Sequence, residues 1–186
     1  SSTAGSVIPS MELAASYPSE QAAKEAIELF GREHGFAVVV ASSCNKKGKD
    51  GKLSRFVYLK CDRYGAPKEK EVRLRETGTR KCGCGFTIKL TKRMDSDEYF
   101  PEYVCSSHNH SLSVHPSCHP TLRRRDMLAY GDVIETGLAS GRAPSSIQTD
   151  LRNCRTEDGS IDNNLVAQPT NRDISNMKDP FSYLLY

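Results

Sequence analysis

The pattern of apolar and polar positions divides the first half of the chain into one helix and a series of strands. Ser19 is an expected N-cap, because it stands just before a segment with helical periodicity. Four apolar residues in that segment recur at the spacing of an amphipathic helix: Ala23, Ala26, Ile27 and Phe30. Gly31 and Gly35 bracket the expected end of this helix.

Four later segments have the composition and alternation of β-strands: residues 36–41, 55–61, 84–90 and 99–105. Within the second strand, Val57, Leu59 and Cys61 share one face because side chains alternate with period two. Residues 44–53 are polar and contain glycine, so they are expected to connect the first two strands. Since no crossover helices separate the strands, the pattern predicts an α+β fold with a four- or five-stranded antiparallel sheet.

Helical periodicity returns from Thr121 onward. Four apolar residues predict one helix that closes at Gly141: Met127, Tyr130, Ile134 and Leu138. Pro144 suits the first turn of a second helix. Thr170 and Asp173 have the spacing of a capping box for a third. These helices could form a helix-turn-helix-like bundle, a dimerisation cap or a helical linker.

The domain organisation expected from these patterns has three parts. Residues 1–17 are small and polar and read as a flexible tail, residues 18–112 as the sheet domain, and residues 113–186 as the helical segment.

Charge is distributed unevenly along the chain. Its formal net charge is +3, yet residues 44–93 hold sixteen lysines and arginines against five acidic residues, a local net charge of +11. The rest of the chain therefore carries −8. A local excess of this size is typical of a surface that binds a polyanion, although a solvated lysine-rich loop is the simpler alternative.

Cysteines and histidines provide the most specific chemistry in the sequence. Cys61, Cys84, His108 and His110 offer two thiolates and two imidazoles, which is the ligand set of a closed structural zinc site. Cys82 has the same strand parity as Cys84, so the pattern by itself leaves both as candidates. The ligands are far apart in sequence, so the metal would connect distant strands.

Other function classes receive less support. No apolar run is long enough to span a membrane, and the N-terminus has no signal-peptide pattern, so we expect reduced thiols and no membrane association. We find no nucleophile elbow, phosphate loop or zincin motif. We therefore expect a protein that is not an enzyme and has no small-molecule substrate.

Residues 22–112 resemble the FAR-type (far-red-impaired-response) DNA-binding domain of the WRKY and glial-cells-missing zinc-finger superfamily. The similarity covers about half of the chain. It is carried by the helix that ends at Phe30 and by four motifs: Gly35-Phe36, the strand from Phe56 to Cys61, the run from Arg80 to Phe86, and His108-Asn109-His110-Ser111-Leu112.

This resemblance implies Zn²⁺ bound by Cys61, Cys84, His108 and His110, and so favours Cys84 over Cys82. It also implies a sheet that reads the major groove of double-stranded DNA with a strand edge, here around residues 41–47. The WRKY heptapeptide is absent, so no base preference can be transferred. FAR-type domains occur in Mutator-like transposases and in transcription factors derived from them, which implies a nuclear protein.

We expect the DNA contacts to come from basic and small polar residues near strand ends: Ser43, Asn45, Lys46, Lys47, Lys49, Arg55, Arg80 and Lys81. The run Arg123 to Arg125, at a predicted helix start, would suit an external anion such as phosphate or be a surface accident. The leading hypothesis is sequence-specific binding of double-stranded DNA, with homodimerisation as an option. The alternatives are a zinc-stabilised protein-interaction module and the end-binding region of a transposase whose catalytic domain is absent from this chain.

Overall fold

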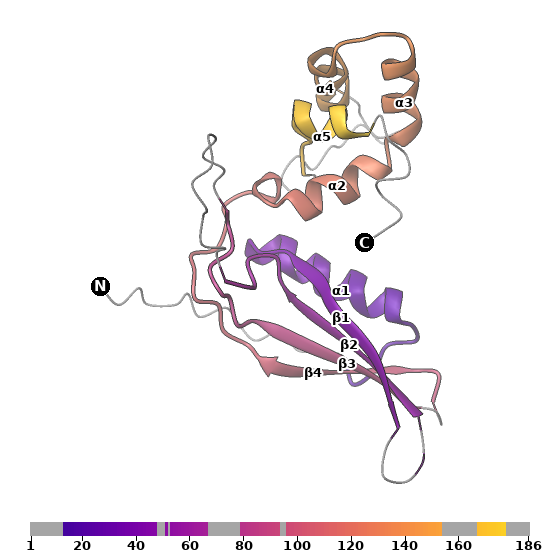
Figure 1. The fold of residues 1–186 in the computed structure, drawn as a ribbon, viewed down its shortest axis with the longest axis vertical. Helices are drawn as coiled ribbons and strands as arrows, with labels where there is room; N and C mark the ends of the chain where they lie inside the picture. The colour runs from indigo at the N-terminus through magenta and orange to yellow at the C-terminus, as the bar shows by residue number, and fades with distance from the viewer. Residues whose placement is uncertain are drawn as a thin grey trace, which may run out of the picture. The chain divides into compact units, whose positions relative to one another are not determined.

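A helix and an antiparallel sheet form the first of two compact units, Ser1–Ser113 and Val114–Tyr186. The computed structural model describes residues 13–47, 51, 53–66, 79–93, 96–153 and 167–177. The first unit contains α1 (Glu20–His34), β1 (Val38–Lys47), β2 (Leu53–Cys61), β3 (Thr87–Arg93) and β4 (Tyr99–Cys105). The strands pair in the order β1-β2-β3-β4, all antiparallel, which confirms the expected α+β class (Figure 1).

Both ends of α1 follow from local sequence. The hydroxyl of Ser19 accepts a hydrogen bond from the Ala22 N–H at 3.0 Å, as expected for the N-cap. At the other end Gly35 has φ 77°, a conformation that favours glycine. A Cβ on Gly35 would also lie 2.2 Å from the Ser113 carbonyl oxygen. Glycine therefore ends the helix and lets the segment after β4 approach it closely.

The core lies between α1 and one face of the sheet. Ala23 and Ile27 of α1 are fully buried in one cluster with the predicted inner face of β2. That face is confirmed, because Val57, Leu59 and Cys61 are all at most 1% exposed. Leu90 is fully buried in the same cluster, as the alternation in β3 predicts. The opposite face of the sheet carries the polar and aromatic residues of the same strands.

Strand β1 is longer than its apolar content suggests. The expected connection at residues 44–53 is wrong, because β1 continues to Lys47 and β2 begins at Leu53. Asn45 pairs with Arg55 and Lys47 with Leu53, after a bulge between Val40 and Ser42. Backbone pairing with β2 holds this polar segment in a strand, although it buries almost no apolar surface.

The end of the expected N-terminal tail is attached to the sheet. Tyr17 and Tyr99 exchange two backbone hydrogen bonds, of 2.9 and 2.8 Å, and Leu13 packs against the core. Leu13 and Tyr17 therefore contact the first unit, whereas residues 1–12 of the expected tail lie outside the described part of the chain.

The second unit consists of short helices: η1 (Pro116–Cys118), α2 (Pro120–Leu128), α3 (Gly131–Ala139), α4 (Pro144–Asn153) and α5 (Asn171–Asn176). The prediction of a single helix from Met127 to Leu138 is wrong, because α2 ends at Leu128 and a new helix, α3, begins at Gly131. The Tyr130 N–H bonds the Met127 carbonyl in a tight turn. Met127 and Ile134 nevertheless share one core with Ile147, so the apolar period runs through the break.

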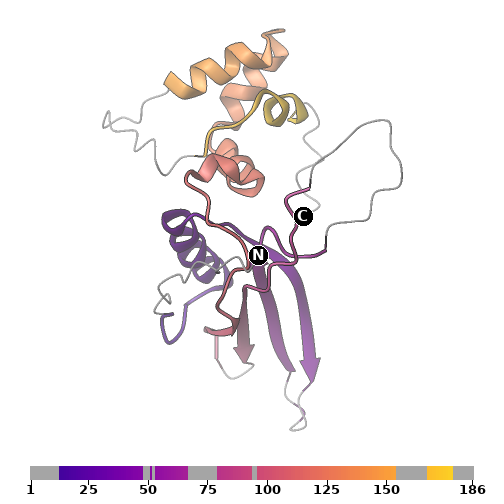
Figure 2. The same ribbon diagram turned by 90° about the vertical axis from the view of Figure 1, so that its left-hand side faces the viewer.

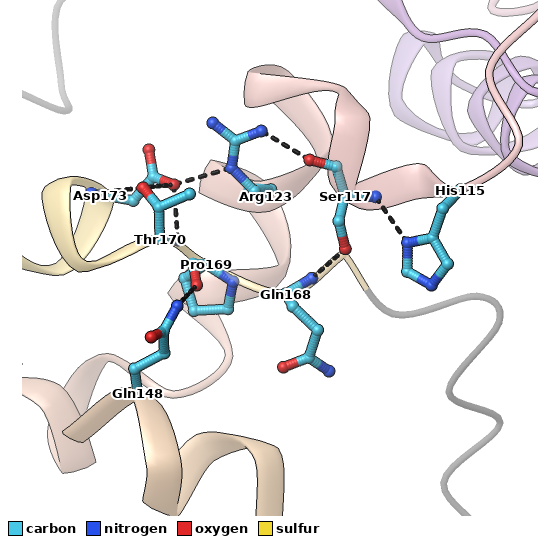
Figure 3. Close-up of polar contacts among 8 residues, drawn as sticks. All are labelled: His115, Ser117, Arg123, Gln148, Gln168, Pro169, Thr170 and Asp173. Atoms are coloured by element: carbon cyan, nitrogen blue, oxygen red, sulfur yellow. Dashed lines mark hydrogen bonds and ion pairs between the residues drawn. The ribbon is translucent and has the colours of Figure 1, made fainter. Parts of the chain in front are cut away.

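A largely buried ion pair organises this helical unit (Figure 3). The Arg123 guanidinium donates to the Asp173 carboxylate at 2.7 Å and to the Ser117 carbonyl at 2.6 Å. Thr170 and Asp173 form the predicted capping box of α5. Burial alone would raise the pKa of Asp173, but hydrogen bonds from Arg123 and Thr170 together lower it. The expectation that Arg123 binds an external anion is therefore wrong, because Asp173 occupies it.

Two further hydrogen bonds join separate segments of the same unit (Figure 3). The Gln168 N–H donates to the Ser117 hydroxyl at 2.8 Å, and the Gln148 amide donates to the Pro169 carbonyl at 2.6 Å. They bring residues 167–170 against η1 and α4, although residues 154–166 are outside the described part. None of the described helices combines the length and the apolar character needed to cross a membrane.

We predict that Arg123→Ala destabilises the helical unit by about 3 kcal/mol, because it leaves the Asp173 carboxylate buried without its charge partner. Arg124→Ala is the matched control, since Arg124 is exposed and its loss should change the free energy of unfolding by less than about 0.5 kcal/mol. Chemical denaturation of the full chain measures both effects.

The same ion pair predicts a dependence on pH. The pKa of Asp173 is lowered in the folded state, so its stabilising contribution is present at neutral pH and is lost as the pH falls through that lowered value. Arg123→Ala should reduce this acid sensitivity. Equal stability losses in Arg123→Ala and Arg124→Ala would contradict the assignment.

Candidate metal centre

Four candidate ligands meet at one end of the sheet. Cys61 is the last residue of β2, Cys84 precedes β3, and His108 and His110 follow β4. The antiparallel register places these positions together, because Thr87 at the start of β3 pairs with Lys60 on one side and Cys105 on the other. Their ligand atoms all lie within 4.8 Å of one another, so the cluster could hold a metal ion.

The distances inside this cluster fit a tetrahedral ion. Cys61 Sγ lies 3.3 Å from His110 Nε2, and Cys84 Sγ lies 3.4 Å from His108 Nδ1. The two histidine nitrogens are 3.2 Å apart. Metal–sulfur bonds of about 2.3 Å and metal–nitrogen bonds of about 2.0 Å give tetrahedral edges of roughly 3.3–3.8 Å. The four side chains therefore need only small adjustments to surround one ion.

The two imidazoles are held in different ways. His110 Nδ1 donates to the Ser111 carbonyl at 2.9 Å, which leaves Nε2 with its lone pair directed at the cluster. The ring of His108 stacks on Phe86 with centroids 4.3 Å apart and contacts Phe36 at 4.7 Å. His108 Nε2 is buried without a hydrogen-bond partner among the described residues. Aromatic packing thus positions His108, and hydrogen bonding positions His110.

The two thiols behave as one acid–base pair in the metal-free protein. A hydrogen bond from the Cys61 thiol lowers the pKa of Cys84, assisted by His108 and by the backbone N–H groups of Phe86 and Asn109. The same hydrogen bond, together with burial, raises the pKa of Cys61. A metal ion held by this cluster would bind both sulfur atoms as thiolates, so its binding would release the protons that the two thiols carry.

Asn109 is a supporting residue that sequence reasoning passed over. Its side-chain amide donates to the Cys82 carbonyl at 3.0 Å and to the Gly83 carbonyl at 3.4 Å. Gly83 has φ 69°, so the turn just before Cys84 requires a residue that adopts the left-handed backbone conformation, which glycine does readily. The position of Asn109 between the two histidines could have indicated a supporting role. Its partners could not be predicted, because the two hydrogen bonds join residues 27 and 26 positions apart in the chain.

The structure separates Cys82 from Cys84. Cys84 is 4% exposed and belongs to the metal cluster, whereas Cys82 is exposed and its thiol donates to the Asn109 side-chain oxygen at 3.4 Å. Among the described residues, these four are the one set of three or more metal-binding side chains that comes together. The ambiguity that strand parity leaves between the two cysteines is therefore resolved in favour of Cys84.

The residues expected to contact DNA do not form one surface. Residues paired across antiparallel strands project from the same face. By this register Ser43 and Asn45 lie on the α1 side of the sheet and Lys46 on the opposite side. All three are exposed, as is Lys47 on the α1 side. β1 is an edge strand among the described strands, so Ser43, Asn45 and Lys47 on one side and Lys46 on the other lie along the same strand edge.

The other expected contacts are dispersed. Arg55 lies on the α1 side and forms an ion pair with Glu20 of α1 at 3.0 Å. Arg80 and Lys81 are exposed in the segment before Cys82, at the metal end of the sheet. Lys49 lies outside the described residues.

We predict that Cys84→Ser and His110→Ala each abolish stoichiometric metal binding and unfold the sheet domain, because binding free energy at such a site is folding free energy. Cys82→Ser is the matched control and should retain one ion per chain. Titration with Co²⁺, followed by its thiolate charge-transfer absorption, measures both. Loss of binding in Cys82→Ser with retention in Cys84→Ser would reverse the ligand assignment.

Comparisons with known proteins give one similarity. No family model matches the chain, and no solved structure matches it. A segment of the PKS-NRPS hybrid synthetase cheA of Chaetomium globosum is 36% identical over 121 residues, which is 62% of this chain. The match spans 2% of the synthetase, so the synthetase as a whole is not a guide to the activity of this chain.

Proposed function

We propose that the protein binds double-stranded DNA through the edge of β1, in a sheet whose fold is stabilised by Zn²⁺. The observation that carries this proposal is the exposed polar end of β1. Ser43, Asn45 and Lys47 project on one side of the strand and Lys46 on the other. The major groove, about 12 Å wide, admits a two-stranded β-ribbon, and a strand that enters edge-on meets bases on both sides.

Zinc is the ion that best suits the donor set. Two thiolates and two imidazoles in a buried tetrahedral arrangement are typical of structural zinc. Four protein ligands leave no open position for water or substrate. The site would therefore act as a cross-link and not as a catalytic centre.

Charge supports a polyanionic partner. The segment 44–93 carries a formal charge of +11. Two of its lysines, Lys46 and Lys47, are exposed at the end of β1. Such residues contact phosphates and supply most of the sequence-independent affinity for DNA.

In this arrangement the residues that contact bases would be distant from the metal site that stabilises the fold. Val38 pairs with Cys61 at the metal end of β1, and Asn45 lies seven residues further along the strand. At about 3.3 Å per residue, Asn45 is roughly 20 Å from the metal end. The base-reading residues can therefore change without disturbing the metal centre.

The FAR-type resemblance of residues 22–112 implies these four ligands and a reading strand around residues 41–47. We therefore propose membership of that group, and with it a nuclear role in transcription or in binding transposon ends. The leading alternative remains a zinc-stabilised protein-interaction module. Salt dependence separates the two, because counterion release is particular to polyanions.

We predict that affinity for duplex DNA falls steeply with salt. If about six lysines and arginines contact phosphates, the slope of log affinity against log salt should be about −5. Lys46→Ala should reduce the magnitude of this slope by about 1 and weaken all sequences alike. A slope near zero would favour the protein-interaction alternative. Fluorescence anisotropy at several salt concentrations measures it.

We predict that Asn45→Ala relaxes base preference at one position of the target and costs about 1–3 kcal/mol of binding free energy. Asn153→Ala is the matched control, because Asn153 is an exposed asparagine in the helical unit. Selection of bound sites from random duplexes measures both variants. A change with Asn153→Ala but not with Asn45→Ala would transfer recognition to the helices.

A further inference from the structure

The sheet face opposite α1 carries a second surface that duplex binding by the β1 edge does not use. By the strand register this open face includes Phe56, Tyr58 and Lys60 of β2 and Lys89 of β3. In the described part of the first unit, α1 is the helix that packs on the sheet, and it contributes to the core on the other face (Figures 1 and 2). Phe56, Tyr58 and Tyr64 each keep part of their surface exposed, being neither fully buried nor fully exposed.

Lysines and aromatic rings are interleaved on this face. Lys89 Nζ lies 5.1 Å from the centroid of Phe56. Tyr64 follows the end of β2, and the Nζ atoms of Lys60 and Lys81 lie 5.7 and 5.4 Å from the centroid of its ring. We call this surface the aromatic–basic track, and define it by five residues: Phe56, Tyr58, Lys60, Tyr64 and Lys89.

The charge of the open face is positive. Among the described side chains of the strands, three lysines project from it: Lys46, Lys60 and Lys89. Glu102, paired with Lys89 in the register, is the acidic residue among them. Rings bordered by cations suit a ligand that offers both flat faces and negative charge.

We infer that the aromatic–basic track binds single-stranded nucleic acid, with bases stacked on Phe56, Tyr58 and Tyr64 and phosphates beside Lys60 and Lys89. Aromatic residues on an open sheet stack unpaired bases, and every base offers a π-face, so binding of this kind tolerates many sequences. Paired bases in a duplex are covered by their neighbours and cannot stack in this way. The inference stands independently of duplex binding by β1, because it concerns other residues and another form of nucleic acid.

Tyr58 gives the most direct test. The full zinc-bound chain is mixed with labelled oligo-dT, oligo-U and a duplex, and binding is followed by anisotropy. Tyr58→Ala should weaken binding of the single strands about tenfold, whereas Tyr58→Phe keeps the ring and should bind like the parent. Duplex binding should be unchanged in both variants. Binding of oligo-dT and oligo-U to a similar extent would indicate stacking without sugar recognition, and a preference for one would name the natural strand; either result supports the track.

Lysines on opposite faces of β3 provide a matched electrostatic comparison. Lys89 lies over Phe56 and pairs with Glu102, while Lys92 lies over Tyr99 at 5.8 Å and pairs with Asp97 on the α1 side. Lys89→Ala should weaken single-strand binding several-fold and Lys92→Ala should not. This pair decides the question even if Tyr58→Ala fails to fold, which its metal content would reveal.

Intrinsic fluorescence gives an independent readout. The chain has no tryptophan and eight tyrosines, so tyrosine emission is observable directly. Stacked bases should quench part of this emission. In Tyr58→Phe the part of the quenching that comes from Tyr58 should be absent, while the affinity for the single strand is unchanged. The inference is overturned if the parent binds no single strand at low salt, if Tyr58→Ala binds like the parent, or if Lys92→Ala loses as much affinity as Lys89→Ala.

Discussion

The convergence of four ligand side chains at one end of the sheet is the constraint on which the first unit depends. Cys61, Cys84, His108 and His110 come from three separate segments, and their ligand atoms lie within 4.8 Å of one another. The unit has one described helix and four strands, so its core is small. An ion at this position would fix the ends of β2, β3 and β4 together. The aromatic packing around His108 connects this position to the core, so metal binding here would be coupled to folding.

The sheet presents three surfaces with different chemistry. One face is covered by α1 and is apolar, with Ile27 and Leu59 at its centre. The other face carries aromatic rings and lysines, and the free edge of β1 carries small polar and basic side chains. Because side chains alternate along each strand, a single sheet can present an apolar face, an aromatic and basic face, and a polar edge without additional elements.

The helical unit uses another means of stabilisation. Its helices are short, and the Arg123–Asp173 pair connects α2 to α5 in addition to the apolar core that the two helices share. The same arginine bonds the Ser117 carbonyl, so one side chain organises three segments. This explains why a run of three arginines need not indicate an external anion. The first of them is an internal structural residue, and its partner lies fifty positions away.

The sequence by itself determined the local elements. Strand parity placed Val57, Leu59 and Cys61 on the buried face, and cap chemistry placed Ser19 and Thr170 at helix starts, because these signals depend on neighbouring residues. It did not determine which cysteine belongs to the cluster or that β1 continues to Lys47. Nor did it determine that the helix after Thr121 is interrupted near Tyr130, or that Arg123 forms an ion pair with Asp173. Each of those depends on a contact between residues far apart in the chain. Only the tertiary structure supplies such contacts, because periodicity describes which face a side chain takes and not which partner it meets.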